Sequence, residues 1–106
     1  MASKTISMKR KATESSGDFL NRLKLGSVKY RVRLVAKLVK EHDYESAGSE
    51  EYDLWEQVLS EVASFKADDA TEDELLEAVK RFDHVAELAR EALKTKEISF
   101  NRMASL

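Results

Sequence analysis

Apolar residues recur at helical spacing through the first half of the chain. Val28, Val32, Val35 and Val39 are separated by four, three and four positions, so they fall on one side of a helix. The segment KYRVRLV also alternates between polar and apolar residues, as a half-buried strand does. The whole run is about four helical turns long, more than an ordinary strand, and therefore predicts a helix over residues 28–42.

A shorter helix is predicted just before it, over the segment FLNRLKL. Three residues near its start can accept a hydrogen bond from a free backbone amide: Ser15, Ser16 and Asp18. Gly26 is expected to end this helix, because glycine tolerates the left-handed conformation that often follows a helix end. Ser27 would then cap the helix that follows.

The polar segment EHDYESAGS, residues 41–49, contains Gly48 and predicts a linker. Ser49 can cap a further helix over residues 50–67. The apolar positions of that helix follow the three-four spacing of a buried face: Leu54, Trp55, Val58, Leu59, Val62 and Phe65.

The last predicted helix has a clear start signal. Thr71 and Glu74 form a T-x-x-E capping box, in which each side chain can satisfy an amide of the first turn. One apolar face then continues without interruption to the end of a single helix: Leu75, Val79, Phe82, Ala86, Ala89 and Leu93.

These elements predict an all-α or mainly α fold, a single-domain bundle of three to four helices. The chain of 106 residues has no proline and only three glycines, which favours long helices over a turn-rich β architecture. We expect a basic N-terminal arm at residues 1–16, the bundle at 17–96 and a C-terminal extended tail at 97–106.

The two ends of the chain resemble each other. TISMKRKA at residues 5–12 and EISFNRMA at 97–104 share an Ile-Ser-apolar core, and each alternates as a short strand would. They could pair with each other or dock on a neighbouring molecule. The protein-interface candidates are Ile6, Met8, Tyr52, Trp55, Ile98 and Phe100; for Trp55, core packing is the default role and an interface anchor the alternative.

Charge is strongly segregated along the chain. Residues 1–40 carry eleven lysines and arginines against Glu14 and Asp18, whereas residues 41–106 carry seven against eighteen acidic residues. The two halves could pack together and neutralise each other. Alternatively, at least one half faces an oppositely charged partner.

The basic helix is the best candidate for a binding surface. At about 100° per residue, Lys29, Arg33, Lys37 and Lys40 fall within a sector of about 80°, to one side of the valine stripe. Such a helix can pack its valines inward and offer a row of cations to anionic groups. The full candidate set for contact with nucleic acid or an acidic partner is Lys9, Arg10, Lys11, Arg22, Lys24, Lys29, Arg33, Lys37 and Lys40.

Other chemistries find little support in the sequence. There is no cysteine, and His42 and His84 lie in no metal-ligand or catalytic motif, so we expect no metal, no cofactor and no enzyme activity. No apolar run is long enough for a membrane helix or a signal peptide. We therefore expect a cytoplasmic protein.

These observations predict a small non-catalytic binding protein, a regulatory or assembly factor compatible with a viral or mobile-element origin (if viral, in the host cytoplasm). Its basic N-terminal half would contact nucleic-acid phosphates or an acidic protein surface. Two alternatives stay open. The protein could be an acidic helical inhibitor or adaptor that occupies a partner's basic groove, or a homo-oligomeric assembly protein that joins its neighbours through its terminal segments.

Overall fold

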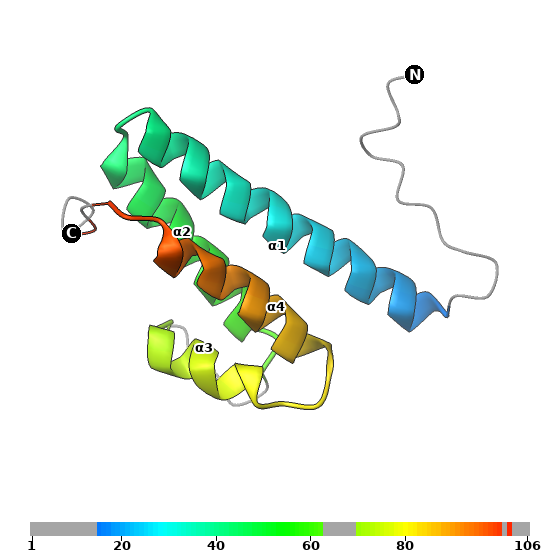
Figure 1. The fold of residues 1–106 in the computed structure, drawn as a ribbon. Coiled ribbons are helices and arrows are strands. Elements are labelled where there is room, and N and C mark those ends of the chain that lie inside the picture. The colour runs from blue at the N-terminus through cyan, green and yellow to red at the C-terminus, as the bar shows by residue number, and fades with distance from the viewer. Residues whose placement is uncertain (1–14, 63–69, 101, 103–106) are drawn as a thin grey trace, which may run out of the picture.

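The computed structural model describes residues 15–62, 70–100 and 102, and these form an all-α bundle with no strand among them. The elements are α1 (Ser16–Lys40), α2 (Tyr44–Leu59), α3 (Glu72–Val79), α4 (His84–Ala92) and the short 3-10 helix η2 (Leu93–Glu97). The helices α1 and α2 form a hairpin, α4 packs beside both of them, and α3 lies at the far side of α4 (Figure 1). The expected all-α bundle is confirmed. None of the described helices is both long and apolar enough to cross a membrane.

The core lies where α1, α2, α3 and α4 meet. Its side chains are Val28, Leu54, Trp55, Val58, Leu59, Ala70, Leu75, Ala78, Val85, Leu88, Ala89 and Ala92. Trp55 donates its indole N–H to Oγ1 of the fully buried Thr95 at 3.1 Å, which links α2 to η2. Trp55 is only 7% exposed and therefore belongs to the core.

Residues 16–40 form one continuous helix, so the prediction that Gly26 ends a helix is wrong. Ser15 caps α1 by accepting a hydrogen bond from the Asp18 amide at 3.0 Å, and no described glycine has a positive φ. Glycine inside a helix costs about 0.5–1 kcal/mol relative to alanine. The packed face that continues from Leu25 through Val28 and Val35 outweighs that cost. Ser27 is accordingly a mid-helix residue and caps nothing.

The predicted linker at residues 41–49 is also mostly helical, because α2 begins at Tyr44. The turn is made by His42, whose φ is 62°. His42 N–H donates to the Val39 carbonyl and Asp43 N–H to the Leu38 carbonyl, each at 2.9 Å, which is the Schellman pattern of a helix end. Asp43 then caps α2, in place of the expected Ser49.

The long helix expected after Thr71 is two helices. Thr71 does cap α3, accepting from the Glu74 amide at 3.3 Å. The helix is interrupted at residues 80–83. Asp83 caps α4 by accepting a hydrogen bond from the Val85 amide at 3.1 Å. Phe82, which the sequence placed on the buried face, is fully exposed in this break. The cap at Asp83 offers the backbone an alternative to a continuous helix.

The chain segment after η2 is held against the start of α2. Phe100 stacks on Tyr44 with ring centroids 6.3 Å apart, and Arg102 lies over the Phe100 ring at 4.1 Å. Residues 1–14 of the expected N-terminal arm, which include Ile6 and Met8, lie outside the described residues, whereas its last two residues belong to the cap and first turn of α1.

Candidate binding surface on α1

Two cations of α1 are neutralised inside the bundle. Lys24 Nζ lies 2.9 Å from Glu61 Oε1, and Arg31 Nε lies 2.6 Å from Glu50 Oε2. Arg31 also donates to Gln57 Oε1 at 2.6 Å. These contacts join the basic helix to the acidic half of the chain, so the two halves do neutralise each other in part. Lys24 thus belongs to the helix–helix interface.

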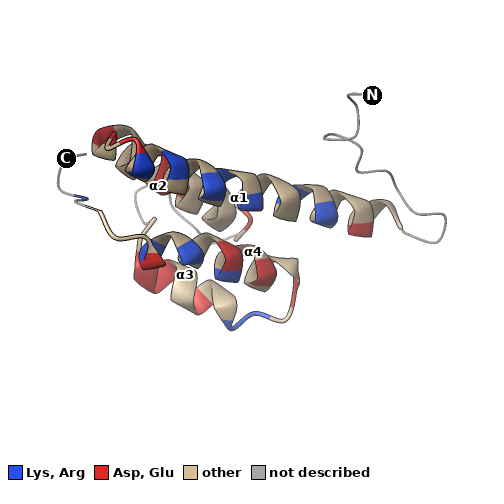
Figure 2. Cartoon of the chain, turned by 45° about the horizontal axis from the view of Figure 1, so that its top comes forward, with Lys and Arg blue, Asp and Glu red and all other residues tan. Residues whose placement is uncertain are grey.

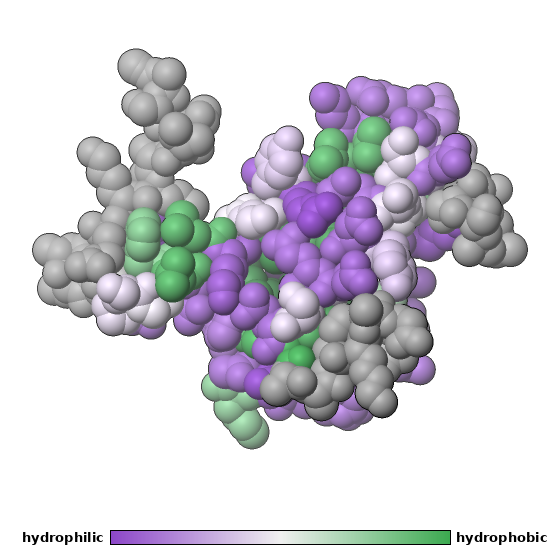
Figure 3. All heavy atoms as spheres, turned by 180° about the vertical axis from the view of Figure 1, so that it is seen from behind, coloured by the Kyte–Doolittle hydropathy of each residue, from purple (hydrophilic) through white to green (hydrophobic). Residues whose placement is uncertain are grey.

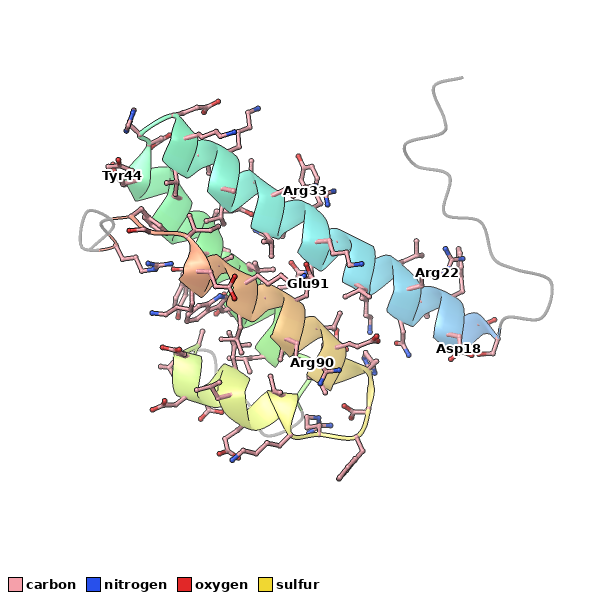
Figure 4. The ribbon with its side chains drawn as sticks, viewed as in Figure 1. Asp18, Arg22, Arg33, Tyr44, Arg90 and Glu91 are labelled. Atoms are coloured by element: carbon pink, nitrogen blue, oxygen red, sulfur yellow. The ribbon has the colours of Figure 1, made fainter. Side chains whose placement is uncertain are left out.

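Four other cations of α1 form a row on the opposite flank, which we call the basic ridge: Lys29, Arg33, Lys37 and Lys40. All four side chains are exposed, and none has an ion pair within the described part of the chain. Arg33, Lys37 and Lys40 surround a shallow surface depression together with Ala36. Figure 2 shows cations recurring along α1, and Figure 4 shows Arg33 pointing away from α4. The ridge can bind several anionic groups at once.

The ridge adjoins further cations that the sequence did not single out. Lys29 lines a groove between α1 and α4 together with Arg90 and Lys94, and also with the acids Glu87 and Glu91. Lys94 is paired with Glu91 at 3.0 Å. Nothing in the sequence indicates that α4 packs against α1 at this level, so Arg90 could not be assigned to the surface in advance.

Of the other predicted basic residues, Arg22 lies on the same side of α1 as the ridge, seven residues before Lys29. Arg22 is half-buried and packs over the Phe19 ring at 5.4 Å, near the start of α1. Lys9, Arg10 and Lys11 are outside the described residues. The structure therefore places five of the nine predicted cations on one side of α1, and four of these form the ridge.

The acidic side chains of the second half of the chain are also of two kinds, paired within the bundle or exposed. Glu50, Glu51 and Glu61 of the α2 region are all in ion pairs within the bundle. The hydrogen bond from Lys24 holds the pKa of Glu61 below its ordinary value; partial burial opposes this, and His84 at 3.4 Å lowers the pKa further. Four exposed acids lie within the two turns of α3, at Glu72, Asp73, Glu74 and Glu77 (Figure 2).

The aromatic interface candidates differ in exposure. Tyr52 on α2 is 45% exposed, whereas Phe100 is half-buried on Tyr44, and Ile98 is half-buried next to it. His42 interacts with the Tyr44 hydroxyl at 3.0 Å. Within residues 15–62, 70–100 and 102, no three histidine, aspartate or glutamate side chains converge as metal ligands would.

No family model, no curated protein and no solved structure matches this chain. Its own surface chemistry therefore has to indicate what it does. The arrangement that differs most from an ordinary solvated helix is the basic ridge. Glu50 of α2 and Glu61, just after α2, neutralise two other cations of α1, whereas these four have no ion pair in the described structure.

Proposed function

We propose that the protein is a non-catalytic binding protein that uses the basic ridge of α1 to hold an anionic macromolecular partner. The observation that carries this proposal is the contrast within α1. Lys24 and Arg31 are paired with Glu61 and Glu50, whereas Lys29, Arg33, Lys37 and Lys40 are exposed and have no ion pair in the described chain.

The spacing of the ridge supports binding at several points. Its residues lie at intervals of four, four and three along one helix, so they span about 16 Å of one face. Isolated surface cations contribute little to affinity, but a row that meets a row of anions displaces several counterions together. This makes binding steeply dependent on salt.

The test is a salt titration with two anionic probes, a fluorescent DNA duplex and poly-glutamate. Binding should weaken steeply between low and moderate salt, and with duplex DNA the log–log slope should approach about −4 if all four cations contribute. The double variant Arg33→Glu with Lys37→Glu should abolish it. A matched double variant, Lys80→Glu with Lys96→Glu, changes charge equally on another surface and should bind as the wild type does. If neither probe binds at low salt, the proposal is wrong.

A second candidate function has one observation in its favour. The exposed acids of α3 lie beside two exposed apolar side chains, Leu76 at 46% and the fully exposed Phe82. This surface suits an inhibitor or adaptor that occupies a basic, partly apolar groove of a partner. This function would be favoured if partner binding were lost on charge reversal of α3 but fully retained in the ridge variants.

A further inference from the structure

A second face of α1 is apolar although it does not face the core. Its apolar residues are Leu20, Leu23, Tyr30 and Leu34, which we call the outer stripe; with Ser27 between them they lie at intervals of three, four, three and four residues. Leu20 is 54%, Leu23 36% and Tyr30 59% exposed. Figure 3, the view from behind, shows hydrophobic surface at the end of the molecule where α1 begins. The three-four spacing is the one that helices use to pack against other helices.

The outer stripe and the core stripe occupy different sides of α1. At about 100° per residue, the outer stripe is centred about 120° from the buried Val28 and Val35. The basic ridge is centred about 100° from the outer stripe, on the side away from Val28 and Val35. A surface helix needs one apolar face for its own core. α1 has two, and the second is bordered on one flank by the ridge.

The other flank of the outer stripe is the edge of α2. Gln57 donates to Ser27 Oγ at 3.3 Å, and Arg31 on the same side is already bonded to Glu50 and Gln57. This flank is therefore polar and locally neutral. Among the described residues, an occupant of the stripe would therefore meet a row of unpaired charges on the side of the ridge and paired charges on the side of α2.

Charge decides among the possible occupants. A second copy packed through this stripe would bring one α1 against another, and α1 carries seven cations against the single acid Asp18. The chain's own N-terminal segment is unsuitable for the same reason, since it carries Lys4, Lys9, Arg10 and Lys11 against Glu14. Like charges across a contact are destabilising. The complementary occupant is acidic.

We propose that the outer stripe of α1 docks an acidic amphipathic helix of a partner protein. The partner's apolar residues, spaced by three and four, pack on Leu20, Leu23, Tyr30 and Leu34. Its carboxylates lie along one flank and meet Arg33 and Lys37 of the ridge. This inference rests on the proposed function and names the class of its partner. The apolar contacts provide affinity that salt does not screen, and the ridge fixes the orientation.

The experiment uses the full chain and two synthetic peptides of about 20 residues, long enough to lie along most of α1. One peptide places leucines at three-four spacing with glutamates on one flank. The other has the same composition in a scrambled order that spreads the leucines around the helix. The ordered peptide should bind at least about tenfold more tightly and should gain helical circular dichroism on binding.

Variants separate the stripe from the ridge. Leu23→Ser with Tyr30→Ser should weaken the ordered peptide by about tenfold or more, while leaving poly-glutamate binding unchanged. The control Tyr52→Ser with Leu76→Ser removes equally exposed apolar side chains elsewhere and should have no effect. Because all four positions are exposed, the variants should keep the wild-type helical content.

Three results would overturn the inference while the proposed function stands. The first is that the ordered and scrambled peptides bind the protein equally tightly. The second is that the stripe variant binds the ordered peptide as tightly as the wild type does. The third is that duplex DNA binds much more tightly than the ordered peptide, with an affinity that the stripe variant does not change. A dimer in sedimentation equilibrium that the stripe variant dissociates would also overturn it, in favour of a second copy. Failure of every anionic probe would instead reject the proposed function itself.

Discussion

Arg102 and Glu51 form a bidentate ion pair that joins the chain's C-terminal segment to α2. Nε lies 2.8 Å from Oε1 and Nη2 lies 2.9 Å from Oε2. Nη2 also donates to the carbonyls of Thr95 and Ile98 at 2.8 and 3.2 Å. The Glu51 side chain is only 8% exposed, so its charge depends on this one arginine.

Arg102→Met should lower the free energy of unfolding by about 2–4 kcal/mol, because it leaves the Glu51 carboxylate buried without its partner. Urea denaturation followed by Trp55 fluorescence measures this loss. Glu51→Leu combined with Arg102→Met should recover much of it, since no buried charge then remains.

The control for this variant is Lys80→Met. Lys80 pairs with Glu77, but both side chains are more than 70% exposed, so its loss should change the stability by less than about 0.5 kcal/mol. An Arg102→Met variant as stable as this control would show that the ion pair contributes nothing.

Gly26→Ala should raise the stability by about 0.5–1 kcal/mol, because Gly26 lies inside α1 with ordinary helical geometry. If Gly26 instead ended a helix in the left-handed conformation, alanine there would be destabilising. The sign of the change in the urea midpoint therefore separates one continuous helix from two.

The opposite substitution elsewhere in α1 provides a matched test. Ala36 is an exposed residue in the interior of α1, so Ala36→Gly should lower the stability by a similar amount. A loss of stability in Gly26→Ala together with no effect of Ala36→Gly would contradict a continuous α1.

The Glu61 carboxylate should make stability depend on acid pH. The hydrogen bond from Lys24 lowers its pKa in the folded protein, against the partial opposing effect of burial, so folding favours the ionised form. Its contribution is complete above the pKa of the unfolded chain, about 4.3, and is lost as the pH falls from there through the lowered folded value.

Unfolding of the wild type and of Glu61→Gln should be compared from neutral pH down to about pH 3. The stability difference between them should be constant near neutrality and shrink in acid. Asp53→Asn is the control, because Asp53 is exposed on α2, the helix that precedes Glu61, and has no ion pair among the described residues. A difference that grew in acid would contradict the sign of the Glu61 shift.

The faces of the helices could be predicted from the sequence, whereas their ends could not. Val28 and Val35 of the valine stripe and the Leu54–Trp55–Val58–Leu59 face of α2 are buried as their spacing predicts, whereas Val32 and Val39 are half-buried. The predicted helix ends are wrong at both glycines that the sequence offers as stop signals. Gly26 and Gly48 both lie inside helices, while His42 supplies the left-handed residue that glycine usually provides. A glycine permits a break, but packing on both sides decides whether one occurs.

The candidate surface could be predicted only in part for a related reason. Helical periodicity alone placed Lys29, Arg33, Lys37 and Lys40 on one flank of α1. Which of the α1 cations are neutralised depends on where α2 docks, and the sequence does not encode that locally. Lys24 is therefore among the predicted binding cations although it pairs with Glu61. The outer stripe has the same three-four spacing as the core stripe, so spacing alone does not show which face of α1 is buried.

The unbroken length of α1 also sets the length of the bundle. From Ser16 to Lys40 the helix axis covers about 36 Å, and Phe100 stacks on Tyr44, just beyond the C-terminal end of that helix (Figure 1). The cap at Ser15 and the stacked pair of Tyr44 and Phe100 are therefore held at opposite ends of the bundle by one continuous helix.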